Sequence, residues 1–163
     1  MRKINVILNK LYSAHSTQVK YNLDNITYLT KIFNYPYKKF KCIHIAGTNG
    51  KGSIAAMLSS ILTASGYTTG LYTSPHLISY NERIKVNDKP ITDEEIIKLY
   101  SKVEKRLHKY WHLPASPSFF EITTLMAFLY FVKKKVEIAV IETGMGGRLD
   151  ATNIIEEPIV SII

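Results

Sequence analysis

Apolar residues follow two different periods along this chain. Near the N-terminus, residues 3–12 and 24–33 carry apolar side chains at helical spacing, as expected for short surface helices. Four strand-like runs occur at 40–46, 67–73, 136–142 and 158–163, and the first of them is a continuous apolar run. Three intervening segments have helical features: 51–65, 92–109 and 119–133. This alternation predicts an α/β domain with a mostly parallel sheet flanked by helices.

Local signals mark where several of these helices begin and end. Thr92 and Glu95 have the spacing of a capping box, and Gly66 is placed to end the helix over 51–65. The strongly apolar run 122–132 is too short to span a bilayer and is flanked by charged residues. We interpret it as a buried helix, and we expect no contact with a membrane.

Composition and charge narrow the function only slightly. The chain has 163 residues, 46% of them hydrophobic and 21% charged, which is ordinary for one globular domain or part of one. A net charge of +8 suits nucleic acid, anionic surfaces or acidic small molecules. The basic residues are dispersed, with short clusters at 37–41 and 133–135, and no nucleic-acid-binding motif is present. We therefore interpret them as solvated surface and expect no nucleic-acid partner.

The cysteine count and the N-terminus bear on the compartment. Cys42 is the single cysteine, so neither an intrachain disulfide nor a cysteine metal cluster can form. The first residues, "MRKINVILNKLYSAHS", lack the apolar core and cleavage site of a secretory signal. We expect a cytoplasmic protein.

A glycine-rich loop, "GTNGKGS", connects an apolar strand to a helix. Backbone N–H groups of such a loop point at an anion, the helix dipole favours negative charge, and Lys51 adds a mobile cation. This context predicts a phosphate loop for ATP made of Gly47, Thr48, Asn49, Gly50, Lys51, Gly52 and Ser53. The alternative is a tight turn with a surface lysine. One departure is clear: Gly52 stands where the common pattern has the hydroxyl residue that binds Mg²⁺.

Three stretches together resemble one family. They are "HIAGTNGKGS" (44–53), "GLYTSPHLISYNERIKV" (70–86) and "VIETGMGGRLDATN" (140–153). In this order and spacing they resemble the folylpolyglutamate synthase and dihydrofolate synthase family, within the Mur-ligase superfamily of ATP-dependent amide-forming ligases. The resemblance covers about residues 36–163. It implies a P-loop-type sheet like the central ATP-binding domain of Mur ligases, with ATP and Mg²⁺ as cofactors.

The resemblance also implies a magnesium site. In the family the hydroxyl ligand matches Ser74 and the carboxylate ligand matches Glu142. The resemblance implies that Glu142 and Lys51 are the catalytic residues of this chain. Hard oxygen ligands suit Mg²⁺, and Glu142 ends a predicted buried strand, where ligands bind in open α/β sheets. Two alternatives remain open: Ser74 caps a turn beside Pro75, or Glu142 pairs with Arg148.

A substrate site is implied in the same way. The family positions at the pterin site match Ser118, Phe119, Phe120, Glu121, Leu149, Asp150 and Ala151. Aromatic rings beside a carboxylate suit a pterin, which stacks and donates N–H groups. Ser118 and Phe119 stand where threonine and tyrosine are common. The alternatives are helix-start packing for the two phenylalanines and a surface turn for the glycine-rich segment 144–153.

Three basic residues have weaker assignments. His76 is a candidate catalytic base, although a loop histidine beside proline seldom has that role. His44 lies inside a predicted strand and is expected to be a packed core histidine. Arg83 is a candidate for positioning a substrate carboxylate, on charge alone.

The family reaction gives the expected function. ATP phosphorylates the carboxylate of dihydropteroate or folate, and the amine of L-glutamate then attacks the acyl phosphate. Full-length members are commonly monomeric. The family's Asp-His pair, carbamylated lysine and C-terminal glutamate-ligase domain have no counterpart here, and the chain ends inside the apolar run 158–163. We therefore expect residues 1–163 to be the N-terminal part of the ATP-binding domain, inactive by itself.

Two other functions remain possible on the sequence. One is a stand-alone nucleotide-binding module whose edge strand docks on a partner chain. The other is a Mur ligase of cell-wall synthesis. Loops of that type usually carry Lys-Thr where this chain has Lys51-Gly52, and they lack the "SPHL" and "GRLDATN" combination.

Overall fold

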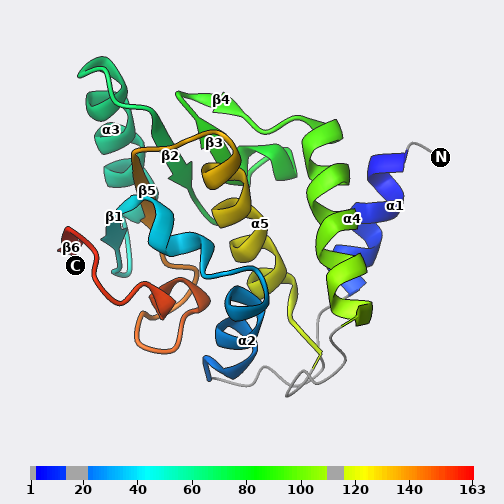
Figure 1. The fold of residues 1–163 in the computed structure, drawn as a ribbon. Helices are drawn as coiled ribbons and strands as arrows, with labels where there is room; N and C mark the ends of the chain where they lie inside the picture. The colour runs from blue at the N-terminus through cyan, green and yellow to red at the C-terminus, as the bar shows by residue number, and fades with distance from the viewer. Residues whose placement is uncertain (1–2, 14–21, 110–115) are drawn as a thin grey trace.

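The fold is built on one six-stranded sheet. A computed structural model of the chain describes residues 3–13, 22–109 and 116–163. The strand order is β4-β3-β2-β5-β1-β6 (Figure 1). The strands are β1 (Lys41–Ile45), β2 (Thr69–Tyr72), β3 (Ile84–Val86), β4 (Lys89–Pro90), β5 (Ile138–Glu142) and β6 (Val160–Ile162). Because β2, β5, β1 and β6 run parallel, the predicted mostly parallel sheet is confirmed.

The central strands explain the continuous apolar runs. All residues of β2 and β5 are buried, as are the last four residues of β1. A parallel sheet is covered on both faces, so its inner strands need apolar side chains on both sides. In the register, Ile45 lies opposite Glu142 and Tyr72 lies opposite Ile141. The carboxyl ends of β1, β2 and β5 therefore meet at one edge of the sheet.

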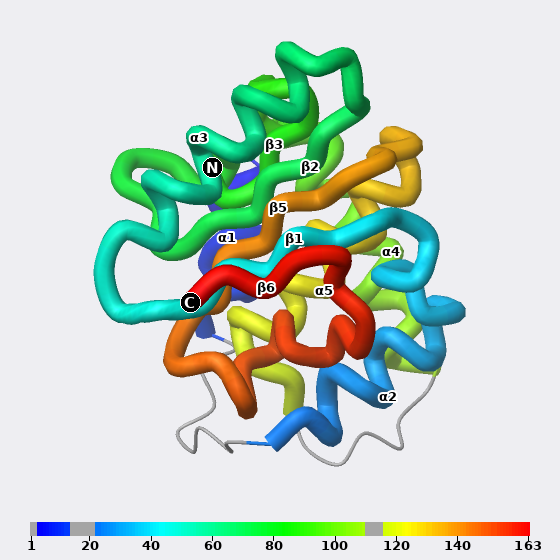
Figure 2. The backbone as a smooth tube through the Cα atoms, turned by 90° about the vertical axis from the view of Figure 1, so that its left-hand side faces the viewer, coloured from blue at the N-terminus to red at the C-terminus, as the bar shows by residue number. Residues whose placement is uncertain are grey.

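Helices cover the two faces unequally. Helix α3 (Lys51–Ala64) packs on one face, against side chains such as Ile45 and Val140. The other helices lie behind the sheet in the view of Figure 2: α1 (Lys3–Ser13), α2 (Asp24–Ile32), α4 (Asp93–Lys109) and α5 (Phe119–Lys133). Helix α5 has 11 of its 15 residues buried, which confirms the buried helix expected over 122–132. No helix in the described ranges is long and apolar enough to cross a membrane.

Some local expectations need correction. The N-terminal helices do not simply lie on the surface, because α1 and α2 each bury an apolar stripe, including Leu11 and Leu29. The capping box at Thr92 is half formed: Glu95 N–H donates to Thr92 Oγ1, but the Glu95 carboxylate pairs with lysines of α5. A complete box occurs instead at Ser118, the N-cap of α5. The described part of the chain also has three short 3₁₀ helices that were not predicted: η1 (Pro36–Lys39), η2 (Tyr80–Arg83) and η3 (Ala151–Ile154).

The contact between β2 and α5 depends on a missing side chain. A Cβ atom placed on Gly70 would lie 2.9 Å from Cδ1 and Cε1 of Phe131, whose ring is fully buried. We expect Gly70→Ala to lower the free energy of unfolding by about 1–3 kcal/mol, because an overpacked core must shift. Urea unfolding measures the change. The double variant Gly70→Ala, Phe131→Leu should recover part of the loss, and an unchanged single variant would contradict the packing described.

Candidate functional site

The glycine loop lies between the end of β1 and the start of α3. Gly50 is the N-cap of α3 with φ 77°, and Gly47 has φ 135°. Both angles lie where L side chains are rare, so glycine is required at these two turns. Thr48, Asn49, Gly50 and Ser53 are exposed, whereas Gly47, Lys51 and Gly52 are partly buried. The predicted order of strand, glycine loop and helix is therefore confirmed.

The Lys51 ammonium is held over this loop. Its Nζ donates to the carbonyl oxygens of Gly47, at 2.9 Å, and Thr48, at 3.2 Å. A cation at the N-terminus of a helix adds to the positive end of the helix dipole. This end of α3 is thus strongly favourable for an anion.

A buried carboxylate faces the same helix end. Glu142 ends β5 and is 5% exposed, and its Oε2 accepts the backbone N–H of Ser74 at 3.1 Å. A Cβ atom on Gly52 would lie 3.6 Å and 3.8 Å from the two carboxylate oxygens, so glycine leaves room beside them. Burial raises the pKa of Glu142, against the opposing effects of the Ser74 N–H and the charge of Lys51. Strand β5, the loop after β2 and the start of α3 therefore bring Lys51, Gly52, Ser74 and Glu142 together.

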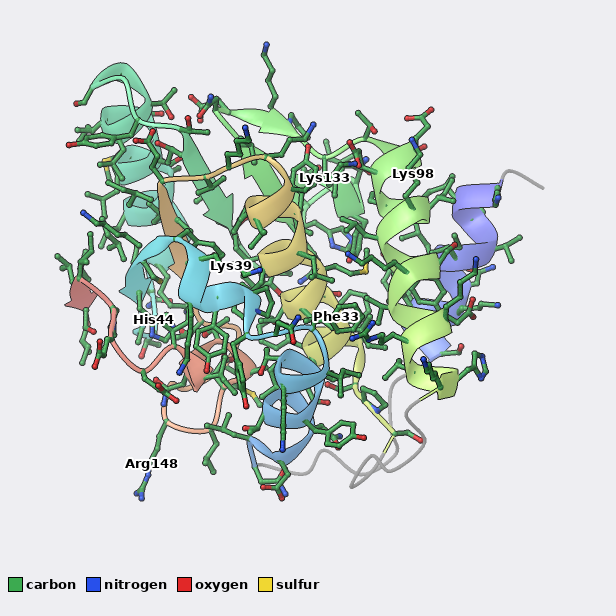
Figure 3. The ribbon with its side chains drawn as sticks, in the orientation of Figure 1. Phe33, Lys39, His44, Lys98, Lys133 and Arg148 are labelled. Carbon is green, nitrogen blue, oxygen red and sulfur yellow. The ribbon has the colours of Figure 1, made fainter. Side chains whose placement is uncertain are left out.

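This arrangement decides between alternatives left open by the sequence. Arg148 is exposed and projects away from the domain, so it does not pair with Glu142 (Figure 3). Ser74 is tied by its backbone to Glu142 instead of capping a turn. These observations place the backbone of Ser74 beside the Glu142 carboxylate and the Arg148 side chain away from it.

The carboxyl end of β5 suits a cation with few protein ligands. The described residues contain no group of three or more His, Cys, Asp or Glu side chains that could hold a metal ion. Thr143, directly after Glu142, is fully buried, and its hydroxyl has no hydrogen-bond partner among those residues. Mg²⁺ commonly takes one or two protein oxygens and completes its shell with phosphate and water. The Glu142 carboxylate, with the Ser74 hydroxyl as the predicted second ligand, fits that ligand set.

A second glycine loop, after β5, is organised by Asp150. This buried side chain accepts the N–H groups of Gly144 and Met145 on Oδ2, at 2.9 Å and 2.8 Å. Its Oδ1 accepts both the N–H and the hydroxyl of Thr152, at 3.0 Å and 2.6 Å. Both oxygens are therefore engaged inside the protein. The alternative of a surface turn describes this segment only in part, because Gly144, Met145 and Leu149 are exposed but the buried Asp150 carboxylate fixes the backbone of the first two.

His44 extends this internal network from β1. Its Nε2 lies 2.7 Å from Thr152 Oγ1, and the side chain points into the domain (Figure 3). Since the Thr152 hydroxyl donates to Asp150, His44 Nε2 is the donor in its own bond. Burial lowers the pKa of His44, while the Asp150 charge opposes this shift. The expected packed core histidine is confirmed, but its link to Asp150 was missed.

The predicted substrate residues fall into buried and exposed groups. Phe119 and Ala151 are buried, whereas Leu149 is 47% exposed. The Phe120 ring lies against Tyr72, with centroids 6.0 Å apart, and fills the space where a side chain on Gly144 would be. Residues 118–121 and the second glycine loop are therefore in direct contact. Helix-start packing, the alternative role for the phenylalanines, holds for the buried Phe119.

The polar groups next to those rings, on Ser118 and Glu121, bond to each other in a capping box. Ser118 N–H donates to Glu121 Oε2 at 2.7 Å, and Glu121 N–H donates to Ser118 Oγ at 3.2 Å. The spacing Ser-x-x-Glu before an apolar run is a known helix-start signal, so the sequence could have revealed it.

A cluster around His76 lies next to the Ser74 loop. Arg83 Nε donates to His76 Nδ1 at 2.7 Å, and Tyr12 OH lies 3.4 Å from His76 Nε2. Burial and then the charge of Arg83 lower the pKa of His76. Because Nδ1 accepts from Arg83, the ring proton is on Nε2 and no free basic nitrogen remains. The geometry disfavours His76 as a catalytic base.

The same loop has a rigid tip. The Glu82 carboxylate accepts the N–H groups of Leu77, Ile78 and Ser79, at 2.8–3.1 Å. These bonds, that of Leu77 first, lower the pKa of Glu82. The side chains of Leu77 and Ile78 remain 91% and 92% exposed. The backbone of this tip is thus fixed while its apolar side chains face solvent.

Comparison with known proteins agrees with this fold. No protein-family model matches the chain. The chain is 43% identical over 147 residues to a Bacillus subtilis dihydrofolate synthase/folylpolyglutamate synthase, covering 89% of this chain and 34% of that protein. A Thermotoga maritima folylpolyglutamate synthase structure matches with TM-score 0.90 and 45% identity, over 98% of this chain and 37% of that one. A folylpolyglutamate synthase complex with AMPPCP and folate matches with TM-score 0.89 and 33% identity, over 97% and 39%.

The fold and the glycine loop define a Mur-ligase-type α/β domain. Within that class, the chain matches the N-terminal portion of folylpolyglutamate synthases and dihydrofolate synthases, which confirms the resemblance seen in the sequence. The chain spans about a third of the length of these relatives, consistent with their N-terminal portion.

Proposed function

We propose that this chain is the nucleotide-binding part of an ATP-dependent ligase that joins L-glutamate to folate or dihydropteroate. One observation carries the proposal: Lys51 and Gly52, at the start of α3, converge with Ser74 and Glu142 at the carboxyl edge of the sheet. That edge is where open α/β sheets bind ligands. A related structure with AMPPCP and folate supports both substrate classes.

The glycine loop would bind the phosphates of ATP. Residues 47–53 supply backbone N–H groups at the positive end of α3, and the Lys51 ammonium is already placed over the loop. Ser74 and Glu142 would hold Mg²⁺, which neutralises phosphate charge when bound. Burial of the Glu142 carboxylate supports this role, because a nearby cation compensates for the lost hydration.

The reaction then needs two substitutions. A carboxylate oxygen of the pteroate or folate attacks the γ-phosphorus of ATP, the bond to the ADP oxygen breaks, and an acyl phosphate forms. The glutamate amine attacks the acyl carbon, phosphate leaves, and the amine loses a proton. The contribution of Lys51 and the loop is positioning and charge stabilisation. The contacting segments 118–121 and 149–151 would hold the pterin.

The division of labour in the whole enzyme belongs to the same proposal. Residues 1–163 would form the N-terminal part of the ATP-binding domain, and a C-terminal domain would supply the glutamate site. The matched relatives have about two thirds of their length outside the match. We expect this chain alone to bind nucleotide without completing the ligation, in the cytoplasm.

Calorimetric titration of this chain with AMPPCP tests the proposal. Mg²⁺ is expected to strengthen binding, and Glu142→Gln should remove that gain, because the amide retains the volume and an acceptor for Ser74 N–H but loses the charge. Glu156→Gln, at an exposed glutamate that pairs with Lys38, is the matched control and should retain the gain. Equal Mg²⁺ dependence in the unaltered chain and Glu142→Gln would refute the metal assignment. No AMPPCP binding by the folded chain would refute the nucleotide site.

A further inference from the structure

Arg83 is a buried cation without an ionic partner. Its side chain belongs to η2 and is 7% exposed. Within the described ranges, its guanidinium donates to the neutral acceptor His76 Nδ1, and the recorded salt bridges all involve lysines. Buried charges in proteins are normally paired, since the loss of hydration costs several kcal/mol per ion. The Nε–H donates to His76, while the Nη atoms have no recorded hydrogen bond in the described ranges and are not sealed from solvent, so an anionic ligand can reach them.

The neighbouring acid does not supply that anion. Glu82 precedes Arg83, but its carboxylate accepts the three N–H groups at the tip of the Ser74 loop. The other titratable side chains that feel the charge of Arg83 are His76, whose Nδ1 accepts from Arg83, and the buried phenols Tyr72 and Tyr80. The surroundings thus leave one net positive charge at this point.

Aromatic rings form the walls around Arg83. The guanidinium carbon lies 5.1 Å from the centre of the Phe119 ring. Tyr12 stacks on Phe119 with centroids 5.3 Å apart, and Tyr80 meets the same ring edge-on at 6.1 Å. When a guanidinium stacks on a ring, its flat face makes the contact and the N–H groups along its edge stay available. Those N–H groups form a fork that matches the two oxygens of a carboxylate. Flat apolar walls beside that fork suit an aryl group that carries the carboxylate.

The backbone fixes Arg83 relative to the proposed phosphate site. Thr73 N–H donates to the Arg83 carbonyl at 3.0 Å, and Ser74, the next residue, donates to Glu142. Phe119, on the other side of Arg83, begins the helix whose residues 118–121 are proposed to hold the pterin. Arg83 therefore contacts both segments: its backbone bonds to Thr73, next to the proposed metal ligand Ser74, and its side chain lies on Phe119 of the proposed pterin residues. The reacting carboxylate of the acceptor must occupy such a place.

We propose that Arg83, held by His76, binds the carboxylate of the acceptor substrate and presents it to the nucleotide. The inference rests on the proposed function and adds a residue and a ligand group to it. Phosphate is the other anion of suitable chemistry. The aromatic walls favour the aryl carboxylate, and the glycine loop already offers a phosphate site.

Pteroate and its neutral amide, pteroamide, differ only at the carboxylate, so comparing their affinities measures what that group contributes to binding. The unaltered chain should bind pteroate about 10- to 100-fold more tightly than pteroamide, the range for hydrogen bonds to a charged group. Arg83→Gln should bind both ligands equally, and Arg83→Lys should discriminate weakly because it retains the charge without the fork. Calorimetric titration of each ligand into each variant measures these ratios.

Two further measurements separate the possible results. Thermal unfolding should show Arg83→Gln as stable as the unaltered chain or more so, because no ion pair is lost. A large loss of stability would instead identify Arg83 as a structural residue. Discrimination that persists in Arg83→Gln, no discrimination in the unaltered chain, or displacement of pteroate by millimolar-range inorganic phosphate would each overturn the inference. AMPPCP binding by the unaltered chain reports separately on the proposed function, so the two failures are distinguishable.

Discussion

Lys51→Ala is expected to weaken AMPPCP binding by about 10- to 100-fold, the range for losing a charge-assisted hydrogen bond to phosphate. The Lys51 ammonium lies over the glycine loop on the carbonyls of Gly47 and Thr48, so no other chain movement is needed to place it near phosphate. The helix dipole and loop N–H groups would remain, which explains why residual binding is expected. In a full-length relative carrying the same change, ATP turnover should be abolished.

The control for this change lies on the same strand–loop–helix unit. Lys41→Ala removes an exposed lysine at the opposite end of β1, and AMPPCP affinity should stay unchanged. The variant pair thus separates the local role of Lys51 from the effect of net charge on an anionic ligand. If both variants lose affinity equally, only the general positive charge matters and the loop assignment fails.

Asp150→Asn is expected to lower the free energy of unfolding by about 3 kcal/mol, because a buried carboxylate accepting four hydrogen bonds is replaced by an amide. Whichever way the amide turns, its NH₂ group faces protein donors. Either the N–H groups of Gly144 and Met145, or the N–H and the hydroxyl of Thr152, then lose their acceptor. Urea unfolding measures the loss. Hydrogen exchange should show faster exchange at Gly144 and Met145.

Asp88→Asn is the matched control for the carboxylate-to-amide change. Asp88 is exposed and has φ 60°, a conformation that asparagine adopts readily. Its free energy of unfolding should change by less than about 0.5 kcal/mol. An Asp150→Asn variant as stable as Asp88→Asn would show that the internal network does not hold the second glycine loop.

Local patterns predicted the parallel core well and the sheet edge poorly. The helix 119–133 was predicted with its observed bounds, since a strongly apolar segment of this length is too long for an ordinary strand. The hairpin of β3 and β4 was missed. Its turn residues are Asn87 and Asp88, residue types that tolerate the positive φ both have here and that a two-residue turn requires. Strands of three and two residues give too short a pattern for periodicity to detect.

The candidate site shows a similar division. The Lys51 loop is a local signal, because strand, glycines and helix are consecutive in sequence. The proximity of Ser74 to Glu142 came from the family resemblance, and the structure places them in contact; their roles stay predictions. The bond from His44 to Thr152 joins residues 108 apart, and no local pattern encodes such a contact. The surroundings of Arg83 were hidden for the same reason.

The strand order has a consequence for how the chain is made. Strand β5 lies between β1 and β2, although it follows both in sequence by many residues. During synthesis at about 5–20 residues per second, β1 must wait about 5–20 s before its neighbour emerges from the ribosome. Throughout that interval β1 has no strand to pair with and β2 can pair only with β3, and such open edges associate readily with other chains. The domain therefore depends on protection from aggregation, by chaperones or by dilution, until β5 arrives and closes the sheet.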